Sequence, residues 1–298
     1  MENKRVLITG ALGHIGSRLI REWPEEMLLL DNLSTQRYAS LFDLKRDFKF
    51  VHEDILTANW DELLKGVYAV IHLAAATDAA ESHRNREKYL KVNYLATKRL
   101  ADACEQYGVR LFFPSTTSVY GSQESLVNED SDLKPQCPYS EAKLMAENYL
   151  RSKKNLRFVI CRFGTIYGWS IGMRFHTAVN LFTWQAINGR GLTVFKTAFE
   201  QKRPYLYLGD AIKAIRHVFY NDLFDQQVYN VLSGNHSVAE LVNVLKQFRD
   251  VQVEFVDSPI MNQLSYETDG SKFEKAGFQP AGRLHEGMQE TINHLWIL

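Results

Sequence analysis

The feature that most limits the possible folds is a glycine-rich turn that follows the first apolar run. Residues 5–9 (RVLIT) lead directly into GALGHIG at 10–16, where a helical pattern begins. Glycines let backbone amides approach a diphosphate, and the helix N-terminus adds partial positive charge. Because this pattern lies between a strand and a helix, it predicts a dinucleotide site. The candidate cofactor contacts are Gly10, Gly13, His14, Ile15 and Gly16.

Short apolar runs alternate with longer stretches of helical periodicity through the first half of the chain. The runs are rich in Val, Ile, Leu and Phe, as parallel strands covered on both faces are. The expected strands are 5–9, 27–31, 48–52, 68–73, 110–115 and 157–161, and the expected helices are 14–22, 59–65, 85–107 and 139–152. This alternation predicts an α/β fold with a Rossmann-type, doubly wound parallel sheet.

The rhythm becomes irregular after residue 168. Helices are expected at 176–188, 210–220, 237–248 and 284–295, with short strands at 192–195 and 205–208. We therefore expect a cofactor-binding domain over 1–168, to which the segment 204–232 returns, and a smaller mixed α/β lobe over 169–298 that binds the substrate.

Composition narrows the class of ligand. The 298 residues carry 35 Lys and Arg against 35 Asp and Glu, without a basic block, which gives no reason to expect nucleic acid or an anionic membrane as partner. The three cysteines contain no CxxC pair, so neither a disulfide framework nor a metal site is expected. The first residues are too short an apolar run for a signal peptide, and no run of about 18 apolar residues occurs, so we expect a cytoplasmic protein with a small ligand.

The second expected strand ends in Asp31, about 20 residues beyond the glycines. A carboxylate there can accept hydrogen bonds from the adenosine ribose hydroxyls and repels a 2′-phosphate. Asn32 and the residues that follow it bring no cation for such a phosphate before Arg37, which is some way off in the sequence. NAD is therefore expected as the cofactor in preference to NADP.

Further motifs follow in order, each at a place that the fold would give it. They are DNLS (31–34), EDI (53–55), HLAA (72–75), VNYLAT (92–97), STTSVYG (115–121), YSEAK (139–143) and RFGTIYG (162–168). With the glycine turn, the set resembles the extended short-chain dehydrogenases/reductases, and within them the NAD-dependent epimerase/dehydratase family that acts on nucleotide sugars. The resemblance covers nearly the whole chain. It implies a nucleotide-diphosphate sugar as substrate and a homodimer formed through the helices at 85–107 and 139–152; the many charges on these helices fit solvent equally well.

The resemblance also implies roles for residues around the cofactor. Asp54 and Ile55 would flank the adenine, and Asn93 would order the sheet edge near the site. Leu73, Ala74 and Ala75 would line the cofactor cleft, although close packing between a strand and a helix explains the same small residues.

Tyr139 and Lys143 are four residues apart in an expected helix, so their side chains are neighbours on one face. In the family that the chain resembles, this pair is catalytic: Tyr139 would exchange a proton, and Lys143 would lower the tyrosine pKa and bind the nicotinamide ribose. Thr116 matches the family's catalytic serine or threonine, whose hydroxyl binds the substrate oxygen. The adjacent Thr117 makes the alignment of this position the main alternative.

The residues beside Thr116 bear on the reaction. The family's dehydratases carry an acidic residue at one or both of the next positions, which here are Thr117 and Ser118. A hydroxyl is a poor acid for a departing hydroxide at neutral pH, so dehydration is disfavoured. The DNLS segment and the triplet AES at 80–82 resemble 4-epimerases more than reductases. We therefore expect epimerisation, most simply at C4, of the sugar.

Three positions are candidates for binding the sugar nucleotide. Arg203 matches a family arginine that binds the diphosphate, and a guanidinium does so bidentately. The family's second arginine is absent from NQLSYETDGSK (262–272), and Arg174 is the candidate substitute. Thr165 stands where the family often has asparagine. Thr116 and Thr117 complete the expected pocket.

Two other functions stay open at this point. A dehydrogenase or keto-reductase would use the same Tyr139, Lys143 and Thr116 but release the oxidised sugar. A regulator that only binds a dinucleotide would need neither the tyrosine nor the lysine, so the presence of YSEAK weighs against it.

Overall fold

A seven-stranded parallel sheet forms the centre of the protein, as predicted. The computed structural model describes residues 4–45, 48–257 and 266–295. The strand order is β10-β6-β5-β4-β1-β2-β3, and every neighbouring pair is parallel. The strands are β1 (Arg5–Thr9), β2 (Met27–Asp31), β3 (Lys49–His52), β4 (Val67–His72), β5 (Arg110–Thr116), β6 (Phe158–Phe163) and β10 (Val228–Val231). This order is that of a doubly wound Rossmann-type fold, in which ligands bind beyond the carboxyl ends of the strands.

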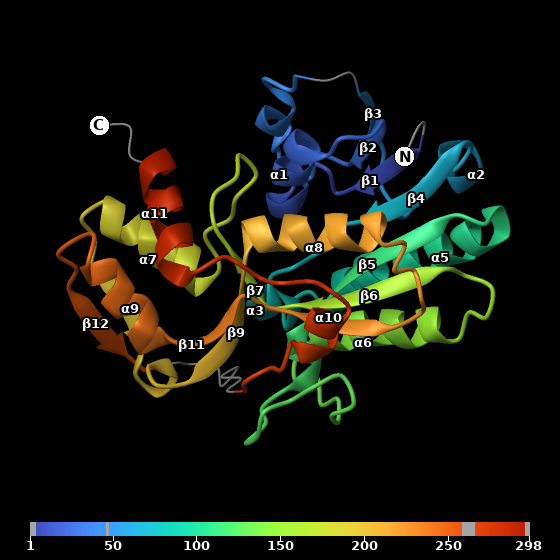
Figure 1. Cartoon of the computed structure of the whole chain (residues 1–298). Coiled ribbons are helices and arrows are strands. Elements are labelled where there is room, and N and C mark those ends of the chain that lie inside the picture. The colour runs from blue at the N-terminus through green and yellow to red at the C-terminus, as the bar shows by residue number, and fades with distance from the viewer. Residues whose placement is uncertain (1–3, 46–47, 258–265, 296–298) are drawn as a thin grey trace.

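Helices cover both faces of this sheet (Figure 1). On one face lie α1 (His14–Glu22) and α8 (Leu208–Tyr220), whose apolar residues share a core cluster with β1, β4, β5 and β6. On the other face lie α2 (Trp60–Leu63), α5 (Ala96–Tyr107) and α6 (Pro138–Arg151). Alternate residues of each strand belong to opposite clusters, as the period of two in a strand requires.

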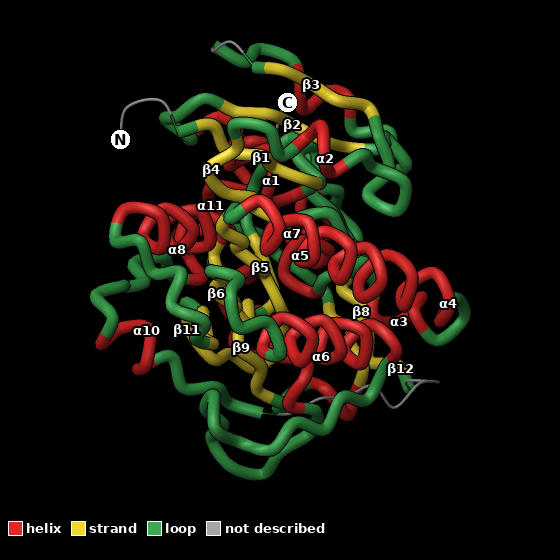
Figure 2. Tube along the Cα trace, turned by 90° about the vertical axis from the view of Figure 1, so that its right-hand side faces the viewer, coloured by secondary structure: helices red, strands yellow, loops and turns green. Residues whose placement is uncertain are grey.

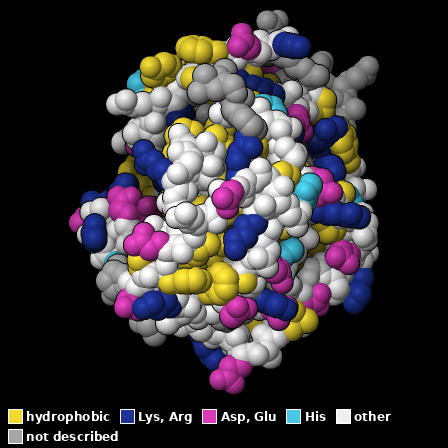
Figure 3. All heavy atoms as spheres, turned by 90° about the vertical axis from the view of Figure 1, so that its left-hand side faces the viewer, with side chains coloured by type: hydrophobic (Ala, Val, Ile, Leu, Met, Phe, Trp, Pro, Cys, Tyr) yellow, Lys and Arg dark blue, Asp and Glu magenta, His cyan; other side chains and the backbone are white. Residues whose placement is uncertain are grey.

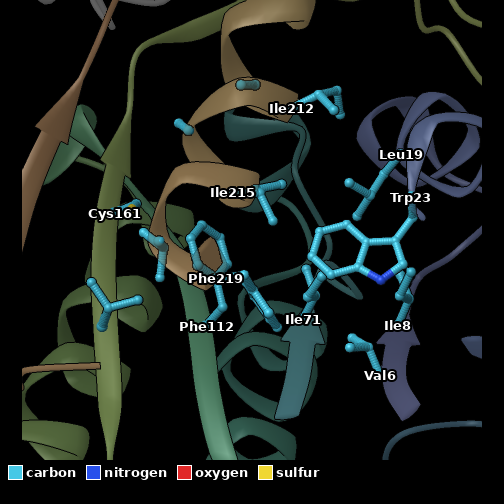
Figure 4. Packing of buried hydrophobic residues seen from close by; sticks show 14 of the residues in the cluster. Val6, Ile8, Leu19, Trp23, Ile71, Phe112, Cys161, Ile212, Ile215 and Phe219 are labelled. Carbon is cyan, nitrogen blue, oxygen red and sulfur yellow. The ribbon is translucent and has the colours of Figure 1, made fainter. Parts of the chain in front are cut away.

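The core on the α1 and α8 face contains the buried Trp23, whose ring lies beside Leu19, Ile8 and Ile71 (Figure 4). Its ring meets Phe219 edge to face at 4.9 Å and 84°, a favoured geometry for aromatic pairs. Val6 and Ile8 of β1 and Leu19 of α1 belong to the same cluster. The glycine turn between β1 and α1 is therefore held by two elements that are themselves fixed in the core.

The expected helix at 85–107 has three consecutive parts: α4 (Arg86–Tyr89), a π-helical turn η2 (Leu90–Leu95) and α5. A short helix α3 (Ala79–Ser82) precedes them. Helix α5 ends at Gly108 with φ +66°, the left-handed C-terminal cap that glycine adopts without strain. π-helical turns are frequent at functional sites, because they turn one side chain out of the regular helical register.

The rest of the chain forms a second lobe beside the main sheet (Figures 1 and 2). It contains a three-stranded sheet, β11-β9-β7, and a two-stranded sheet, β12-β8. Its elements are β7 (Thr165–Tyr167), α7 (Ala178–Ile187), β8 (Leu192–Phe195), β9 (Lys202–Tyr207), β11 (Gly234–Ser237), α9 (Val238–Lys246), β12 (Val253–Val256) and α11 (Leu284–Leu295), while α10 (Ser271–Lys275) lies beside β10. Side chains of both charge signs are scattered over its outer face (Figure 3).

Short strands, most of them in the second lobe, are the main difference from the expected elements. β7, β10, β11 and β12 were not among the expected strands, and β9 begins earlier than expected and ends before residue 208, which opens α8. β11 has the sequence GNHS, which carries no apolar alternation. It is a strand because it pairs antiparallel with β9, so its pairing comes from tertiary contact.

Among the described helices, none has both the length and the apolar character that crossing a membrane requires. Within the same described residues, no cluster of three or more His, Cys, Asp or Glu side chains is suited to hold a metal ion.

Candidate active site

The glycine turn lies against the end of β4. Gly10 has φ +65°, and a Cβ at this position would come within 2.5 Å of the backbone nitrogen of Ala74. Any other residue would therefore have to open the junction of β1 and β4 as well as adopt an unfavourable backbone conformation. At Gly16 a Cβ would lie 2.5 Å from the carbonyl oxygen of Ala11. Neither position therefore has room for a side chain.

Asp31 at the end of β2 is held by backbone amides. Its Oδ2 accepts a hydrogen bond from the amide of Leu12 at 3.1 Å, and its Oδ1 accepts one from Leu33 at 2.9 Å. The Asn32 side chain donates to Asp54 Oδ2 at 2.7 Å, so the two acidic motifs meet. Ile55, next to Asp54, is buried in the core on the α5 face.

Arg37 lies closer to this group than its place in the sequence suggests. Burial lowers the pKa of Arg37, the nearby Arg174 lowers it further, and Asp31 opposes both. The guanidinium of Arg37 is therefore within the electrostatic field of Asp31. The residues directly after Asp31 offer no cation, but the fold brings the Arg37 guanidinium near the Asp31 carboxylate.

A buried chain of hydrogen bonds connects β1, β4 and α5. The hydroxyl of Thr97 donates to the carbonyl of Asn93 at 2.9 Å, so it accepts from His72 Nε2 at 3.1 Å. His72 Nδ1 then accepts from the Thr9 hydroxyl at 2.8 Å, and Thr9 accepts from the amide of Ala74 at 3.2 Å. Burial lowers the pKa of His72 to about 3, which keeps its ring neutral. These hydrogen bonds fix the backbone of Ala74, which is predicted to line the cofactor cleft.

Asn93, in the π-helical turn, holds the backbone just beyond β4. Its Oδ1 accepts from the amide of Ala76 at 2.9 Å, and its Nδ2 donates to the carbonyl of the same residue at 2.8 Å. Leu73 and Ala74 pack against the two opposite core clusters, so they are also packing residues, and Ala75 lies between them and this bond pair.

Tyr139, Lys143 and Thr116 come together at the carboxyl end of β5. Helix α6 begins at Pro138, and Cys137 and Ser140 form a reciprocal N-terminal cap. This start places Tyr139 in the first turn, where it is hydrogen-bonded to Thr116. Thr116 is the last residue of β5 and lies close enough to Tyr139 to affect its pKa, whereas Thr117 is hydrogen-bonded to other residues.

The titration of this pair is set by burial. Burial raises the pKa of Tyr139 to about 12, while Thr116 and the Arg174 guanidinium oppose the shift. Burial lowers the pKa of Lys143 to about 8, opposed by Glu147. Lys143 Nζ donates to the carbonyl of Pro114 at 2.8 Å and lies 4.5 Å from the centre of the Phe113 ring. A cation added beside Tyr139 would stabilise the phenolate that burial disfavours.

Thr117 has a different environment, which involves a residue that the sequence did not suggest. Its hydroxyl donates to the carbonyl of Phe163 at 3.3 Å and accepts from the Tyr266 hydroxyl at 3.1 Å. Tyr266 is buried, and it lies within the electrostatic fields of Tyr139 and Arg203. It adjoins residues 262–265 of the NQLSYETDGSK segment, which lie outside the described residues. The only early sign of its place was that segment's departure from the family pattern.

A loop of the second lobe, residues 168–174, lies directly on the glycine turn. His14 Nε2 donates to the carbonyl of Gly168 at 2.8 Å, and Ser170 donates to the carbonyl of His14 at 2.9 Å. The amide of Gly172 donates to Ser17 at 3.0 Å, and a Cβ on Gly172 would come within 2.5 Å of the Leu12 carbonyl oxygen. The His14 ring is therefore engaged with this loop, and Ile15 packs on the core.

Positive charge gathers between this loop and the catalytic residues. Arg174 donates a hydrogen bond to the hydroxyl of Thr77. The pKa of His14 and that of His176 are lowered to about 4, chiefly by burial and in part by the charges of Arg37 and Arg174. The two imidazoles are therefore neutral at pH 7, and the two guanidiniums give the region its charge. Arg203 and Thr165 lie on neighbouring strands, β9 and β7, of the second lobe.

These residues fit a dinucleotide. The glycine turn leaves no room for side chains where a diphosphate would approach the start of α1, and Asp31 stands at the ribose position of such a fold. Arg37 and Arg174 supply charge that is complementary to a diphosphate.

Comparison with known proteins agrees with the geometry. The sequence model of the "NAD dependent epimerase/dehydratase family" matches residues 6–231. A Bacillus subtilis protein described as an uncharacterized UDP-glucose epimerase, YtcB, is 30% identical, with 98% of each chain covered. A UDP-N-acetylglucosamine 4-epimerase from Methanobrevibacter ruminantium, in complex with UDP-N-acetylmuramic acid, has a TM-score of 0.91 at 24% identity and 99% coverage of both chains, which shows a shared fold. The Thermus thermophilus UDP-glucose 4-epimerase in complex with NAD has a TM-score of 0.86 at 25% identity, covering 97% of this chain and 98% of that one.

Proposed function

The chain belongs to the NAD-dependent epimerase/dehydratase family, with NAD as its cofactor, and we propose that it epimerises a nucleotide-diphosphate sugar at C4. The observation that carries this proposal is the group formed by Tyr139, Thr116 and Lys143, with only hydroxyl side chains at the next two positions. Such a site can move one proton and orient one carbinol, and it lacks an adjacent carboxylic acid.

Each residue of the group has a task in this reaction. Bound NAD supplies a site that accepts a hydride from the carbinol carbon and returns it. Tyr139 removes the hydroxyl proton and later gives it back, and Thr116 orients the sugar oxygen by a hydrogen bond. Lys143 stabilises the tyrosinate by its charge and binds the cofactor ribose. Inversion requires only that the keto-sugar present its opposite face before the hydride returns.

Dehydration is less compatible with this site. The hydroxyl of Thr117 is already held between the Phe163 carbonyl and Tyr266. Ser118 is hydrogen-bonded to Thr116 at 2.9 Å between their hydroxyls. Neither position carries a group that protonates a leaving hydroxide near neutral pH.

The second lobe is the proposed binding region for the sugar nucleotide. In this proposal residues 169–298, apart from the 204–232 segment that returns to the main sheet, hold the nucleotide, and Arg203 and Thr165 line the pocket. Arg174 would reach the diphosphate groups at the junction of cofactor and substrate. The relatives named as UDP-sugar epimerases make UDP-sugars the first substrates to test.

A homodimer is part of the proposal. Leu95, in the π-helical turn before α5, and Met145 of α6 are exposed at 45% and 41%. These apolar side chains lie on the two helices that the family resemblance assigns to a dimer interface. Light scattering should give a particle of twice the 34.4 kDa chain mass.

The alternative is a dehydrogenase or keto-reductase with the same three residues, and one experiment separates it. The purified protein is incubated with UDP-, GDP-, CDP- and dTDP-sugars while the absorbance of reduced nicotinamide is recorded and the products are identified by NMR. An epimerase interconverts two isomers without net NADH. NADH formed in equal amount with a released keto-sugar would overturn the epimerase proposal and leave the roles of Tyr139, Lys143 and Thr116 standing.

A further inference from the structure

A fully buried ion pair lies one helical turn beyond Lys143. Arg162 Nη2 and Glu147 Oε2 are 2.7 Å apart, and the two side chains are 1% and 0% exposed. Arg162 Nε is also 3.2 Å from each carboxylate oxygen. Among the ion pairs of the described residues, only this one has both side chains buried. Burying two charges is costly, so a pair of this kind calls for a reason beyond stability.

The pair is connected to the catalytic strand. The Ser115 hydroxyl donates to Glu147, and Ser115 immediately precedes Thr116 in β5. Lys143 donates to the carbonyl of Pro114, so α6 is fixed to two consecutive residues of β5 by two side chains one turn apart. Arg162 is the register partner of Ser115 on β6 and also donates to the Tyr120 hydroxyl at 2.9 Å. This arrangement sets the position of Tyr139 relative to Thr116.

Among the residues that the structure describes, Glu147 is the one anion whose charge raises the pKa of Lys143. The residues are at i and i+4 of α6, so they lie on one face of the helix. His72 also lies within the electrostatic field of Lys143 and is neutral, while Tyr139 precedes Lys143 by one turn of α6. Charged side chains from the remaining elements around α6 are engaged in surface pairs: Arg86 with Glu141, Lys91 with Glu87, and Lys153 with Asp102.

We propose that Glu147 is a positioning residue for the reaction: its carboxylate keeps Lys143 protonated at neutral pH, and the buried ion pair with Arg162 holds that carboxylate in place. The inference rests on the proposed function, because it concerns how Lys143 remains a cation beside Tyr139. Burial alone lowers the pKa of Lys143, to about 8 even with Glu147 present. Without the carboxylate, the pKa of Lys143 falls further, so the lysine one helical turn after Tyr139 carries less positive charge near neutral pH.

The test measures the lysine directly and needs no substrate. The NAD-bound protein is labelled with ε-¹³C-lysine, and the Lys143 resonance is assigned by its loss in Lys143→Met. We expect Glu147→Gln to lower the titration midpoint of Lys143 by about one pH unit or more. Glu147→Asp should restore most of the shift, because it restores the charge. Glu141→Gln removes a carboxylate from the same helix at the surface and should leave the midpoint unchanged.

Glu147→Gln leaves Arg162 buried without its partner, so it can lower stability enough to prevent folding. The double variant Glu147→Gln, Arg162→Gln removes both charges and keeps the test available. Its Lys143 midpoint should also fall, because the carboxylate is the charge closest to Lys143 along α6. A midpoint within about 0.3 pH units of the wild type in the folded variants would overturn the proposal.

The pH profile of turnover gives a second measure once a substrate is known. In Glu147→Gln its alkaline limb should move toward lower pH together with the Lys143 midpoint, whereas a purely structural defect would reduce turnover at every pH alike. If the panel of nucleotide sugars shows no epimerisation, the lysine titration still decides the present inference. A shifted Lys143 with no epimerase activity would overturn the function and leave the role of Glu147 intact.

Discussion

The two walls of the candidate site are fastened in different ways. The wall formed by β5, β6 and α6 is held by side chains, among them the Arg162–Glu147 pair and the bond from Lys143 to Pro114. The opposite wall, the 168–174 loop, is held on the glycine turn by hydrogen bonds that each join a neutral side chain to a backbone group, such as His14 to the Gly168 carbonyl and the Gly172 amide to Ser17. The first wall therefore depends on a buried pair of opposite charges, and the second depends on the close fit of a small residue, Gly172, against the glycine turn.

The largest effect should come from the wall formed by β5, β6 and α6. Tyr139→Phe removes the proton-exchanging oxygen and should lower turnover on the true substrate by roughly 10²- to 10⁴-fold, the usual contribution of acid–base catalysis. NAD affinity and the melting temperature should stay near those of the wild type, because the ring still packs edge to face with Tyr89. Turnover measured by NMR and NAD binding measured by calorimetry check this. A fully active variant would refute the assignment of Tyr139.

The buried ion pair in the same wall should also contribute strongly to the free energy of unfolding. Arg162→Gln leaves Glu147 buried without a counter-charge, and we expect unfolding in urea to show a loss of about 3–5 kcal/mol. As control, Lys65→Gln breaks an exposed pair with Glu62 and should cause no measurable change. Equal, small effects in both variants would mean that the buried pair does not fasten this wall.

The wall formed by the 168–174 loop should respond to the addition of a single methyl group. In Gly172→Ala the new Cβ must displace the loop from the Leu12 carbonyl, which lies 2.5 Å from its ideal position. We expect NAD affinity to fall at least about tenfold, or about 1.4 kcal/mol, because the loop closes over the cofactor turn. Gly191→Ala is the matched control in the same lobe, since its nearest neighbour is an ordinary contact at 3.6 Å. Unchanged NAD binding in Gly172→Ala would show that the loop does not close the site.

The smallest expected effect concerns the choice between NAD and NADP at Asp31, beside the glycine turn. The protein should bind NAD at least about tenfold more tightly than NADP, because Asp31 repels the extra phosphate. Asp31→Ala should narrow this ratio, chiefly through stronger NADP binding, since Arg37 remains nearby. The double variant Asp31→Ala, Arg37→Met should lose that gain. Calorimetric titration of both cofactors measures the ratio, and equal wild-type affinities would contradict the role of Asp31.

The buried strands of the main sheet were predictable because their own residues specify them. The expected strands 5–9 and 27–31 match β1 and β2 in full, since continuous apolar runs between turn signals have few other stable environments. β10 and β11 escaped prediction for the opposite reason. VYNV and GNHS are short and partly polar, and each forms a strand because a neighbouring strand offers hydrogen bonds.

In the candidate site, too, residues placed by local geometry were predictable and residues placed by long-range contacts were not. The spacing of Tyr139 and Lys143, the glycine turn and Asp31 could be read from the sequence, because a helix repeat and a strand end place such residues by local geometry alone. Tyr266 could not, because it reaches Thr117 across 149 positions.

The sequence alone determined a Rossmann-type sheet, a dinucleotide turn and a tyrosine–lysine pair on one helix face, since each depends on residues within a few turns or one strand of each other. The tertiary structure decided that Thr116 acts on Tyr139, that Tyr266 reaches Thr117, and that Glu147 pairs with Arg162 in the core. The physical reason is that electrostatic and hydrogen-bond energies depend on distance and burial in space. Those two quantities exist only after segments far apart in the chain have packed together.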